Sequence, residues 1–202
     1  MRGKLIVFEG IDGSGTETQS KLLLKHMLSK GIKAERIEYP DYEGDLGKLI
    51  RLFLDRKHEL SAEMQFLLYA GDMVKDREKI NAWLNKGRNV ICDRYFLSTI
   101  VYQGIRGFRR DKALRFAKDF GVPKPDIVFF LNITPDESAK RKMDESGKLD
   151  RNEADLAFLG RVNASYEEMS RSNVFGQWFV LDGEKPKEEI AREVLNVLEK
   201  TS

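Results

Sequence analysis

A glycine-rich turn near the beginning of the chain constrains the fold more than any other feature. The apolar run Leu5–Phe8 is followed by the segment Gly10–Gly15 and then by a helical pattern from Thr16 to Lys30. Glycines let consecutive backbone N–H groups point inwards, and the N-terminus of the next helix adds a partial positive charge. A strand, a glycine-rich loop and a helix in this order are typical of a phosphate-binding loop.

The loop departs at two positions from the P-loop pattern G-x-x-x-x-G-K-[ST]. Gly10 and Gly15 match the pattern, but Thr16 stands in place of the lysine and Glu17 in place of the magnesium-binding Ser or Thr. Loss of a positioned cation costs roughly 3 kcal/mol of transition-state stabilisation. The segment taken alone therefore fits either a phosphate site or a β-to-α turn that only needs tight packing.

Five apolar runs of strand length are spread along the chain, with helical patterns between them. Most runs are nearly continuous rather than alternating, as in parallel strands that helices cover on both faces. We therefore expect an α/β fold of three layers, with a five-stranded parallel sheet, in a single domain of residues 1–202. The expected strands are Leu5–Phe8, Ile37–Tyr39, Val90–Cys92, Ile127–Leu131 and Trp178–Leu181.

Capping residues and apolar spacing predict where several helices begin and end. Gly31 is expected to end the first helix, and Ser61 to cap a long helix that passes Gly71 and runs on towards Gly87. Thr134 precedes a proline and is followed three residues later by a glutamate, which predicts another N-cap. The C-terminal helix has apolar positions at Ile190, Val194 and Leu198.

The composition excludes several classes of protein. The 35 basic and 33 acidic residues are mixed along the chain, so no broad basic surface is available for duplex nucleic acid. No apolar run approaches the roughly 20 residues that a membrane-spanning helix requires. The single cysteine, Cys92, lies in an apolar run and is expected to be a buried structural thiol. We expect a cytoplasmic protein whose anionic partners are small molecules.

The sequence Asp-Arg-Tyr, residues 93–95, follows the third apolar strand directly. Ligands of parallel α/β sheets bind at the carboxyl ends of the strands, so Asp93 and Arg94 are candidates for binding magnesium or phosphate. Other short motifs follow in a specific order and spacing, and with them the chain resembles the thymidylate kinase family over nearly its whole length. The motifs are Phe8–Gly10, Asp12–Gly15, Thr18, Gln19, residues 93–95, Tyr102–Gly104, Lys124–Asp126 and Leu149–Glu153.

The resemblance implies a P-loop nucleoside monophosphate kinase fold and a reaction that moves a phosphoryl group from ATP to dTMP with Mg²⁺. It also implies a homodimer. In this family the phosphate loop and the start of its helix bind ATP. The corresponding residues here are Gly10, Gly13, Ser14, Gly15, Thr16, Glu17 and Thr18.

Residues next to the loop receive catalytic roles from the same resemblance. Asp12 matches the acidic residue that faces the acceptor deoxyribose, and Arg94 matches the arginine at the phosphate groups. Asp93 matches the aspartate near magnesium. Glu17 would either bind the ion through its carboxylate or repel phosphate, and the sequence leaves both alternatives open.

Four further residues match positions around the acceptor base. Tyr69 stands where an aromatic ring stacks on the base, and Pro40 matches the proline that lines the same pocket. Gln103 matches a residue at the base edge, where an amide offers both a donor and an acceptor. Met73 stands where the family usually has an arginine that contacts the base.

The segment 140–153 resembles the family's lid, the loop that closes over ATP and excludes water. Arg141 and Arg151 are its candidate catalytic cations, and a lid cation would offset the missing loop lysine. A second cation also differs from the family. Asp41 and Tyr42 stand where an arginine binds the acceptor phosphate; the possible substitutes are Lys48, Arg51 and Arg77.

Two alternatives to a dTMP kinase stay open. The missing base-contacting arginine at Met73 favours a kinase for dUMP or another pyrimidine monophosphate. The departures at Thr16 and Glu17 favour a nucleotide-binding protein with weak catalysis.

Overall fold

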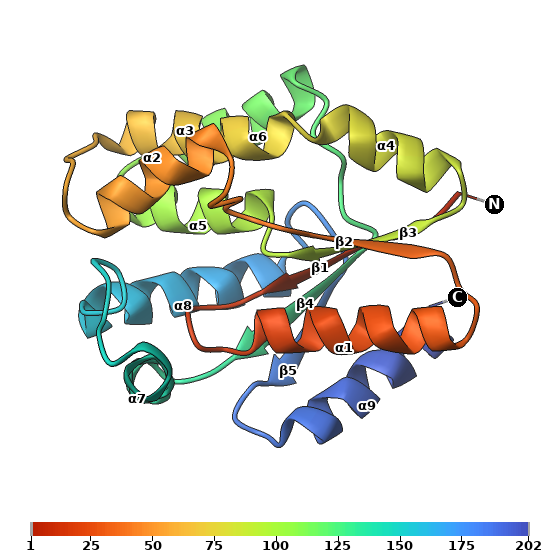
Figure 1. Ribbon diagram of the computed structural model, residues 1–202. Coiled ribbons are helices and arrows are strands. Elements are labelled where there is room, and N and C mark those ends of the chain that lie inside the picture. The colour runs from red at the N-terminus through yellow and green to blue at the C-terminus, as the bar shows by residue number, and fades with distance from the viewer. Residues whose placement is uncertain (1, 202) are drawn as a thin grey trace.

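Five parallel strands form the centre of the molecule in the computed structural model, which describes residues 2–201 (Figure 1). Every neighbouring pair is parallel, and the order across the sheet is β2-β3-β1-β4-β5. The predicted fold class and all five strands are confirmed. The strands are β1 (Leu5–Glu9), β2 (Ala34–Glu38), β3 (Asn89–Asp93), β4 (Ile127–Asn132) and β5 (Trp178–Asp182).

The edge strand β2 differs most from its prediction. It begins at Ala34 rather than Ile37 and ends at Glu38. The apolar pattern missed its first half, because Glu35 and Arg36 are polar residues on an edge strand that is only partly buried. The polar half of this strand carries a residue of the site described below.

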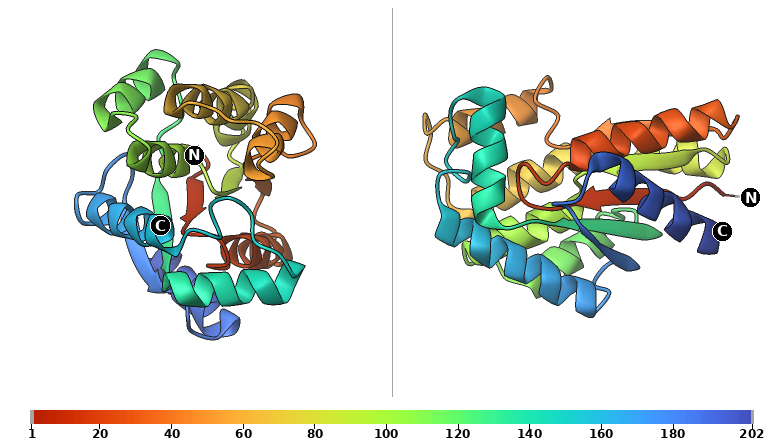
Figure 2. Two further views of the ribbon diagram at one scale, coloured as in Figure 1. Left: turned by 90° about the vertical axis from the view of Figure 1, so that its left-hand side faces the viewer. Right: turned by 90° about the horizontal axis from the view of Figure 1, so that it is seen from below.

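Nine helices surround the sheet in the part of the chain that the structure describes. α1 and α9 cover one face, while α3, α4, α5 and α8 cover the other, with α2 and α6 packed outside them (Figure 1). α7 lies beyond the carboxyl ends of the strands (Figure 2). Among the described residues, no helix is both long and apolar enough to span a membrane. The helices are α1 (Thr16–Ser29), α2 (Asp45–Leu54), α3 (Ala62–Val74), α4 (Arg77–Asn85), α5 (Phe96–Ile105), α6 (Arg110–Asp119), α7 (Pro135–Ser146), α8 (Leu156–Arg171) and α9 (Lys187–Lys200).

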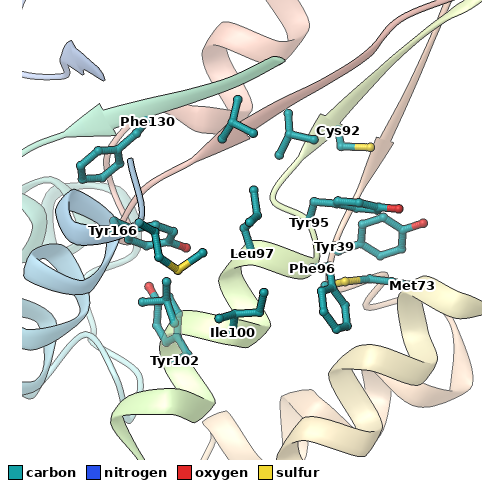
Figure 3. Packing of buried hydrophobic residues seen from close by; sticks show 14 of the residues in the cluster. Tyr39, Met73, Cys92, Tyr95, Phe96, Leu97, Ile100, Tyr102, Phe130 and Tyr166 are labelled. Atoms are coloured by element: carbon teal, nitrogen blue, oxygen red, sulfur yellow. The ribbon is translucent and has the colours of Figure 1, made fainter. Parts of the chain in front are cut away.

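The central strand β1 is buried on both faces, which explains its continuous apolar sequence. Leu5 and Val7 belong to the larger cluster, which includes residues of α3, α5 and α8 and is shown in part in Figure 3. Ile6 and Phe8 belong to the cluster formed with α1 and α9. The predicted burial of Cys92 is confirmed, and this burial raises the pKa of its thiol, which therefore stays uncharged.

The prediction of a single long helix across Gly71 is wrong, because the chain forms α3 and α4 there. The two helices are separated at Lys75 and Asp76. The Lys75 ammonium donates a hydrogen bond to the carbonyl of Asp72 (2.8 Å), and the N–H of Asp76 bonds to Met73, only three residues back. This tighter bond ends the α-helical ladder. Gly71 stays inside α3, where its lack of a side chain leaves room for α2.

Both predicted N-caps are confirmed. The hydroxyls of Ser61 and Thr134 each accept a hydrogen bond from the N–H three residues ahead (both 3.3 Å). The second half of the capping box is different, because Glu184 rather than Glu137 accepts the backbone N–H of Thr134 (3.0 Å). Glu137 instead accepts a hydrogen bond from Arg141, one turn along α7 (2.7 Å).

Replacing Phe66 by alanine tests the larger core cluster. This ring is 2% exposed and stacks on Phe108 with ring centroids 3.9 Å apart. Phe66→Ala is expected to lower the free energy of unfolding by about 3–5 kcal/mol, measured by urea denaturation. Leu28→Ala, at a side chain that is 55% exposed, serves as the control and should change it by less than about 0.5 kcal/mol. Equal effects of the two changes would contradict this account of the core.

Candidate active site

The segment Gly10–Gly15, called the phosphate loop, connects β1 to the first turn of α1. Gly13 and Gly15 have φ angles of 73° and 95°, which favour glycine over residues with side chains. A Cβ on Gly10 would lie 2.4 Å from the Oγ of Ser14, so the loop curls tightly upon itself. The buried Ser14 hydroxyl has no hydrogen-bond partner among the described residues. A bound anion would give it one.

Neither of the two unusual residues after the loop supplies a cation. Thr16 is buried, and its hydroxyl donates a hydrogen bond to the carboxylate of Asp93. The Glu17 carboxylate pairs with Lys21, one turn along α1, and its side chain is 56% exposed. The hydrogen bond from Lys21 lowers the pKa of Glu17, which keeps this carboxylate charged.

Asp93 ends β3 beside the phosphate loop, and an arginine from the neighbouring strand holds it. The Nη2 of Arg36 on β2 donates to Asp93 (2.8 Å), and its other nitrogens donate to Ser20 (2.8 Å) and Glu38 (2.6 Å). Burial raises the pKa of Asp93, an effect that the nearby hydroxyl and guanidinium groups oppose. Sequence reasoning did not identify Arg36, because Asp93 lies 57 residues away from it in the chain.

A pocket opens between the phosphate loop, α2, α3, α5 and the end of the 140–153 segment. All six residues that the resemblance assigned to the acceptor line it, and we therefore call it the acceptor pocket. Sequence reasoning did not assign the other lining residues to this pocket. The six are Asp12, Pro40, Tyr69, Met73, Arg94 and Gln103, and the others are Tyr39, Tyr42, Leu54, Ser98, Tyr102, Asp150 and Asn152.

Arg94 connects the acceptor pocket to the phosphate loop. Its Nη1 donates to the carbonyl of Gly10 (2.7 Å), and its Nη2 donates to Oδ1 of Asp12 (2.8 Å). The hydroxyl of Tyr102 donates to the other oxygen of Asp12 (3.3 Å). The carboxylate is therefore fixed in the pocket wall, with a guanidinium on one side and a phenol on the other.

Met73 lines the pocket at the position where the family usually has an arginine. Met73 is buried in the larger core cluster with Tyr39 and Phe96 (Figure 3). It fills volume there and offers no donor to a base. Gln103 is also buried, and its Oε1 has no hydrogen-bond partner among the described residues. This buried amide oxygen is an unpaired acceptor on a side chain that lines the pocket.

The three possible substitutes for the acceptor-phosphate arginine lie in different places. The Arg51 guanidinium stacks on the ring of Tyr42, 3.8 Å from its centroid, and Tyr42 lines the acceptor pocket. Arg77 instead donates to the carbonyl of Phe120 (2.9 Å), on the outer side of the helical layer. Lys48 is exposed on α2. Of the three, Arg51 is therefore the one that contacts a residue of the pocket wall.

Helix α7 packs directly on the phosphate loop. The Ser138 hydroxyl donates to the carbonyl of Asp12 (2.6 Å), and Arg141 donates to the carbonyls of Gly13 (3.2 Å) and Gly183 (3.0 Å). Arg141 thus ties the loop to the turn after β5. Lys142 lies on the same face of α7, and sequence reasoning gave its ammonium no catalytic role.

Arg151 lies at the other end of the 140–153 segment. Its guanidinium pairs with Glu59 (2.6 Å) and stacks on Phe53, 4.5 Å from the ring centroid. These contacts place it against the connection between α2 and α3 rather than on the phosphate loop. Its catalytic role stays a prediction.

Comparison with known proteins identifies the family. The family model for thymidylate kinase matches residues 8–194, from the end of β1 into α9. The chain belongs to the thymidylate kinase family. The thymidylate kinase of Caldanaerobacter subterraneus subsp. tengcongensis is 36% identical over 186 residues, which cover 90% of this chain and 87% of that protein. The thymidylate kinase of Danio rerio is 31% identical over 199 residues, covering 98% and 91%.

A solved structure supports the same family at the level of the fold. The thymidylate kinase from Candida albicans superposes with a TM-score of 0.77 at 25% sequence identity, covering 98% of this chain and 92% of that one. The resemblance first seen in short motifs is therefore confirmed for the family and for its fold.

One conspicuous contact in this thymidylate kinase family member lies beneath the site. Glu9, the last residue of β1, is fully buried, and one oxygen accepts hydrogen bonds from the N–H groups of Tyr95 (2.9 Å) and Ser98 (3.2 Å). Its other oxygen accepts from the hydroxyls of Ser98 (2.5 Å) and Tyr166 (2.8 Å). Glu9 therefore caps α5 immediately after Arg94. Burial raises the pKa of Glu9 to about 7, although these donors oppose the shift.

This buried carboxyl makes the stability depend on pH. The pKa of Glu9 rises from 4.5 to about 7 on folding, so the folded protein holds the proton more tightly than the unfolded chain. The free energy of unfolding should therefore fall as the pH rises from about 4.5 to 7, by about 3 kcal/mol from this group. Glu9→Gln removes that component, and urea unfolding at pH 5 to 8 measures the difference. Glu199→Gln, at an exposed position, should follow the wild-type profile; parallel profiles of Glu9→Gln and wild type would contradict the assignment.

Proposed function

We propose that this chain transfers the γ-phosphoryl group of ATP to the 5′-phosphate of dTMP, giving ADP and dTDP. Members of the thymidylate kinase family use ATP as the phosphate donor, generally with Mg²⁺. One observation carries the proposal most strongly: the six residues expected at the acceptor line a single pocket, and Arg94 links it to the phosphate loop. The donor and acceptor phosphates would therefore meet at this arginine.

The residues of this chain act by positioning and by charge, because phosphoryl transfer needs little covalent help from protein. Asp12 accepts a hydrogen bond from the 3′-hydroxyl of the acceptor, and Tyr69 lies against its base. Arg94 offers a planar fork of donors that suits two phosphate groups at once. Arg51 would reach the acceptor phosphate from beside Tyr42, on whose ring its guanidinium is stacked.

Asp93 is the residue that best fits magnesium. Its carboxylate is nearly buried beside the loop, whereas the Glu17 carboxylate lies in solvent against Lys21. Among the described residues there is no cluster of three or more His, Cys, Asp or Glu side chains that would hold a metal ion. A magnesium ion with few protein ligands takes the rest from phosphate oxygens and water. When bound, it neutralises charge on the β- and γ-phosphates.

We assign the cation that replaces the loop lysine to Lys142. Arg141 is held by the carbonyls of Gly13 and Gly183, and Arg36 is held by Asp93. Lys142 lies on the same face of α7. A Cβ added to Gly13 would lie 3.4 Å from the Cγ of Lys142, so this side chain runs close to the phosphate loop. The side chain of Lys142 is 23% exposed, and among the described residues its ammonium pairs only with carboxylates.

The partners of the Lys142 ammonium are Glu145 (2.5 Å) and Glu153 (3.6 Å), both on the 140–153 segment. Because these pairs are between side chains, they can be exchanged for a phosphate group without breaking the backbone contacts of the loop. Lys142 interacts electrostatically with Asp12 in the phosphate loop and with Glu17 just after it. The ammonium is therefore placed to reach a phosphate bound in the loop.

Turnover on a panel of acceptors tests the proposed function. With ATP and Mg²⁺, production of ADP should be highest with dTMP and lower with dUMP, dCMP and dGMP. The Candida albicans relative is described as having broad substrate specificity, so the comparison needs all four acceptors. Equal or higher activity on dUMP would overturn the choice of dTMP. Calorimetric binding without ADP production from any acceptor would overturn the enzyme assignment and favour a nucleotide-binding protein.

Two lysines on one helix test the replacement of the loop cation. Lys142→Ala should lower kcat about 10²- to 10³-fold, as the loss of one positioned donor does in other enzymes. The KM for dTMP should change little, because the lost contact is made mainly in the transition state. Lys140→Ala is the matched control, since its side chain is 70% exposed and pairs with Glu137. Similar kcat values for the two variants would exclude Lys142 as the cation that replaces the loop lysine.

We further propose that residues 1–202 act as one kinase domain with a lid at residues 140–153, and that two copies form a homodimer. Apolar side chains on the outer surface support an interface between copies. Leu49 on α2, Met64 and Leu67 on α3 and Phe120 after α6 are each about half exposed. Exposed apolar residues on α2 and α3, which pack against each other, favour protein contact. A cytoplasmic location stays a prediction.

A further inference from the structure

The last residues of the lid form a rigid turn at the acceptor pocket. Oδ1 of Asp150 accepts hydrogen bonds from the N–H groups of Asn152 (2.8 Å) and Glu153 (3.0 Å). The side chain of Glu153 in turn accepts the N–H of Asp150 (2.7 Å). Asn152 is only 7% exposed, although it lies in a connection between helices, and it lines the pocket. The backbone therefore presents this amide at a fixed place.

An arginine just after α5 fixes which way the amide of Asn152 points. The Nη2 of Arg106 donates to Oδ1 of Asn152 (2.6 Å). The guanidinium is held over the rings of Phe158 (4.3 Å to the centroid) and Phe53 (5.7 Å). Because a guanidinium only donates hydrogen bonds, the amide oxygen must face it, and the NH₂ group is left for another partner. Within the described residues, the Nδ2 of Asn152 has no acceptor.

A buried acceptor lies in the wall of the same pocket. Gln103 precedes Arg106 by one turn of α5, and its Oε1 has no partner among the described residues. The pocket thus offers one unpaired amide oxygen, from Gln103, and one unpaired amide NH₂ group, from Asn152. The 4-oxo pyrimidine edge of dTMP presents the complementary pair, an acceptor at O4 and a donor at N3–H. Met73 supplies no polar group to that edge.

We propose that Asn152 donates a hydrogen bond to O4 of the acceptor base while Gln103 accepts one from N3–H. Arg106 is the positioning residue that holds the Asn152 amide in this orientation. The inference rests on the proposed function, since it concerns the acceptor of that same reaction. It makes the lid part of the base-reading site. It also predicts discrimination against cytosine, which carries an amino group at C4 and an unprotonated N3.

Asn152→Asp tests the proposal, because it exchanges a donor for an acceptor without changing the size of the side chain. The dissociation constants of dTMP, dUMP and dCMP are measured by calorimetry on wild type and variant. The preference for dTMP over dCMP should fall about 100-fold or more, because a buried polar group is then mismatched. The dissociation constants of dUMP and dTMP should change by the same factor in the variant, since both bases carry O4 and N3–H. A change in the dTMP to dCMP preference of less than about threefold would overturn the proposal.

Variants of Arg106 separate positioning from a structural role. Arg106→Met should lower the preference for dTMP over dCMP about tenfold, and Arg106→Lys should restore most of it, because only the lysine can still donate to the Asn152 oxygen. Arg109→Met, at an exposed arginine that pairs with Asp111, is the control and should leave the preference unchanged. If Arg106→Lys and Arg106→Met weaken all three nucleotides equally, the positioning role is excluded.

Two outcomes distinguish this inference from the proposed function. Wild-type protein that binds dTMP but phosphorylates none of the acceptors would overturn the kinase function, while the binding preferences would still decide the role of Asn152. Active wild type with an unaltered preference in Asn152→Asp would overturn only the present inference. If Asn152→Asp does not fold, Asn152→Ala replaces it, and an unchanged dissociation constant for dTMP would exclude the contact.

Discussion

The guanidinium of Arg94 is the interaction on which the rest of the site depends. It bonds at once to the carbonyl of Gly10 and to the carboxylate of Asp12, so a single cation belongs to both the phosphate loop and the acceptor pocket. Its backbone φ of 60° lies in the left-handed region, which is unfavourable for a residue with a side chain. Glu9 offsets this strain by accepting the N–H groups that follow in α5. The buried carboxylate therefore supports the arginine from below.

The positive charge of the site is spread over several elements instead of being concentrated in the loop. The loop contributes backbone donors and glycine geometry, whereas Arg36 comes from β2, Arg51 from α2 and Lys142 from α7. Each of these cations is held by a carboxylate or an aromatic ring. A chain can thus keep the backbone cradle while changing the side chain that normally completes it, because electrostatic stabilisation depends on where charge is placed and not on which segment carries it.

The sequence predicted the sheet well, because continuous apolar runs report burial on both faces whatever the neighbours are. It failed between α3 and α4, where the helix ends through the bond from Asp76 to Met73 and the contact of Lys75 with Asp72, which no pattern of apolar spacing contains. The acceptor residues followed from family motifs, and the structure gathers them in one pocket. Arg36 was not predicted, and Arg51 was only one of three alternatives. Their positions depend on pairs such as Arg36 with Asp93, which are 57 residues apart.

The contacts of α7 divide this helix into two parts with different mechanical properties. Its first half is attached to the loop through Ser138 and Arg141, which bond to backbone carbonyls. Its second half is held mainly by side-chain ion pairs, such as Lys142 with Glu145, and pairs near the surface contribute about 0–1 kcal/mol each. The ion pairs of the second half can therefore be exchanged at little energetic cost, whereas the backbone contacts of the first half keep the shape of the phosphate loop. Lys142 lies between the two halves, so a small rotation of the second half would move its positive charge relative to the phosphate loop.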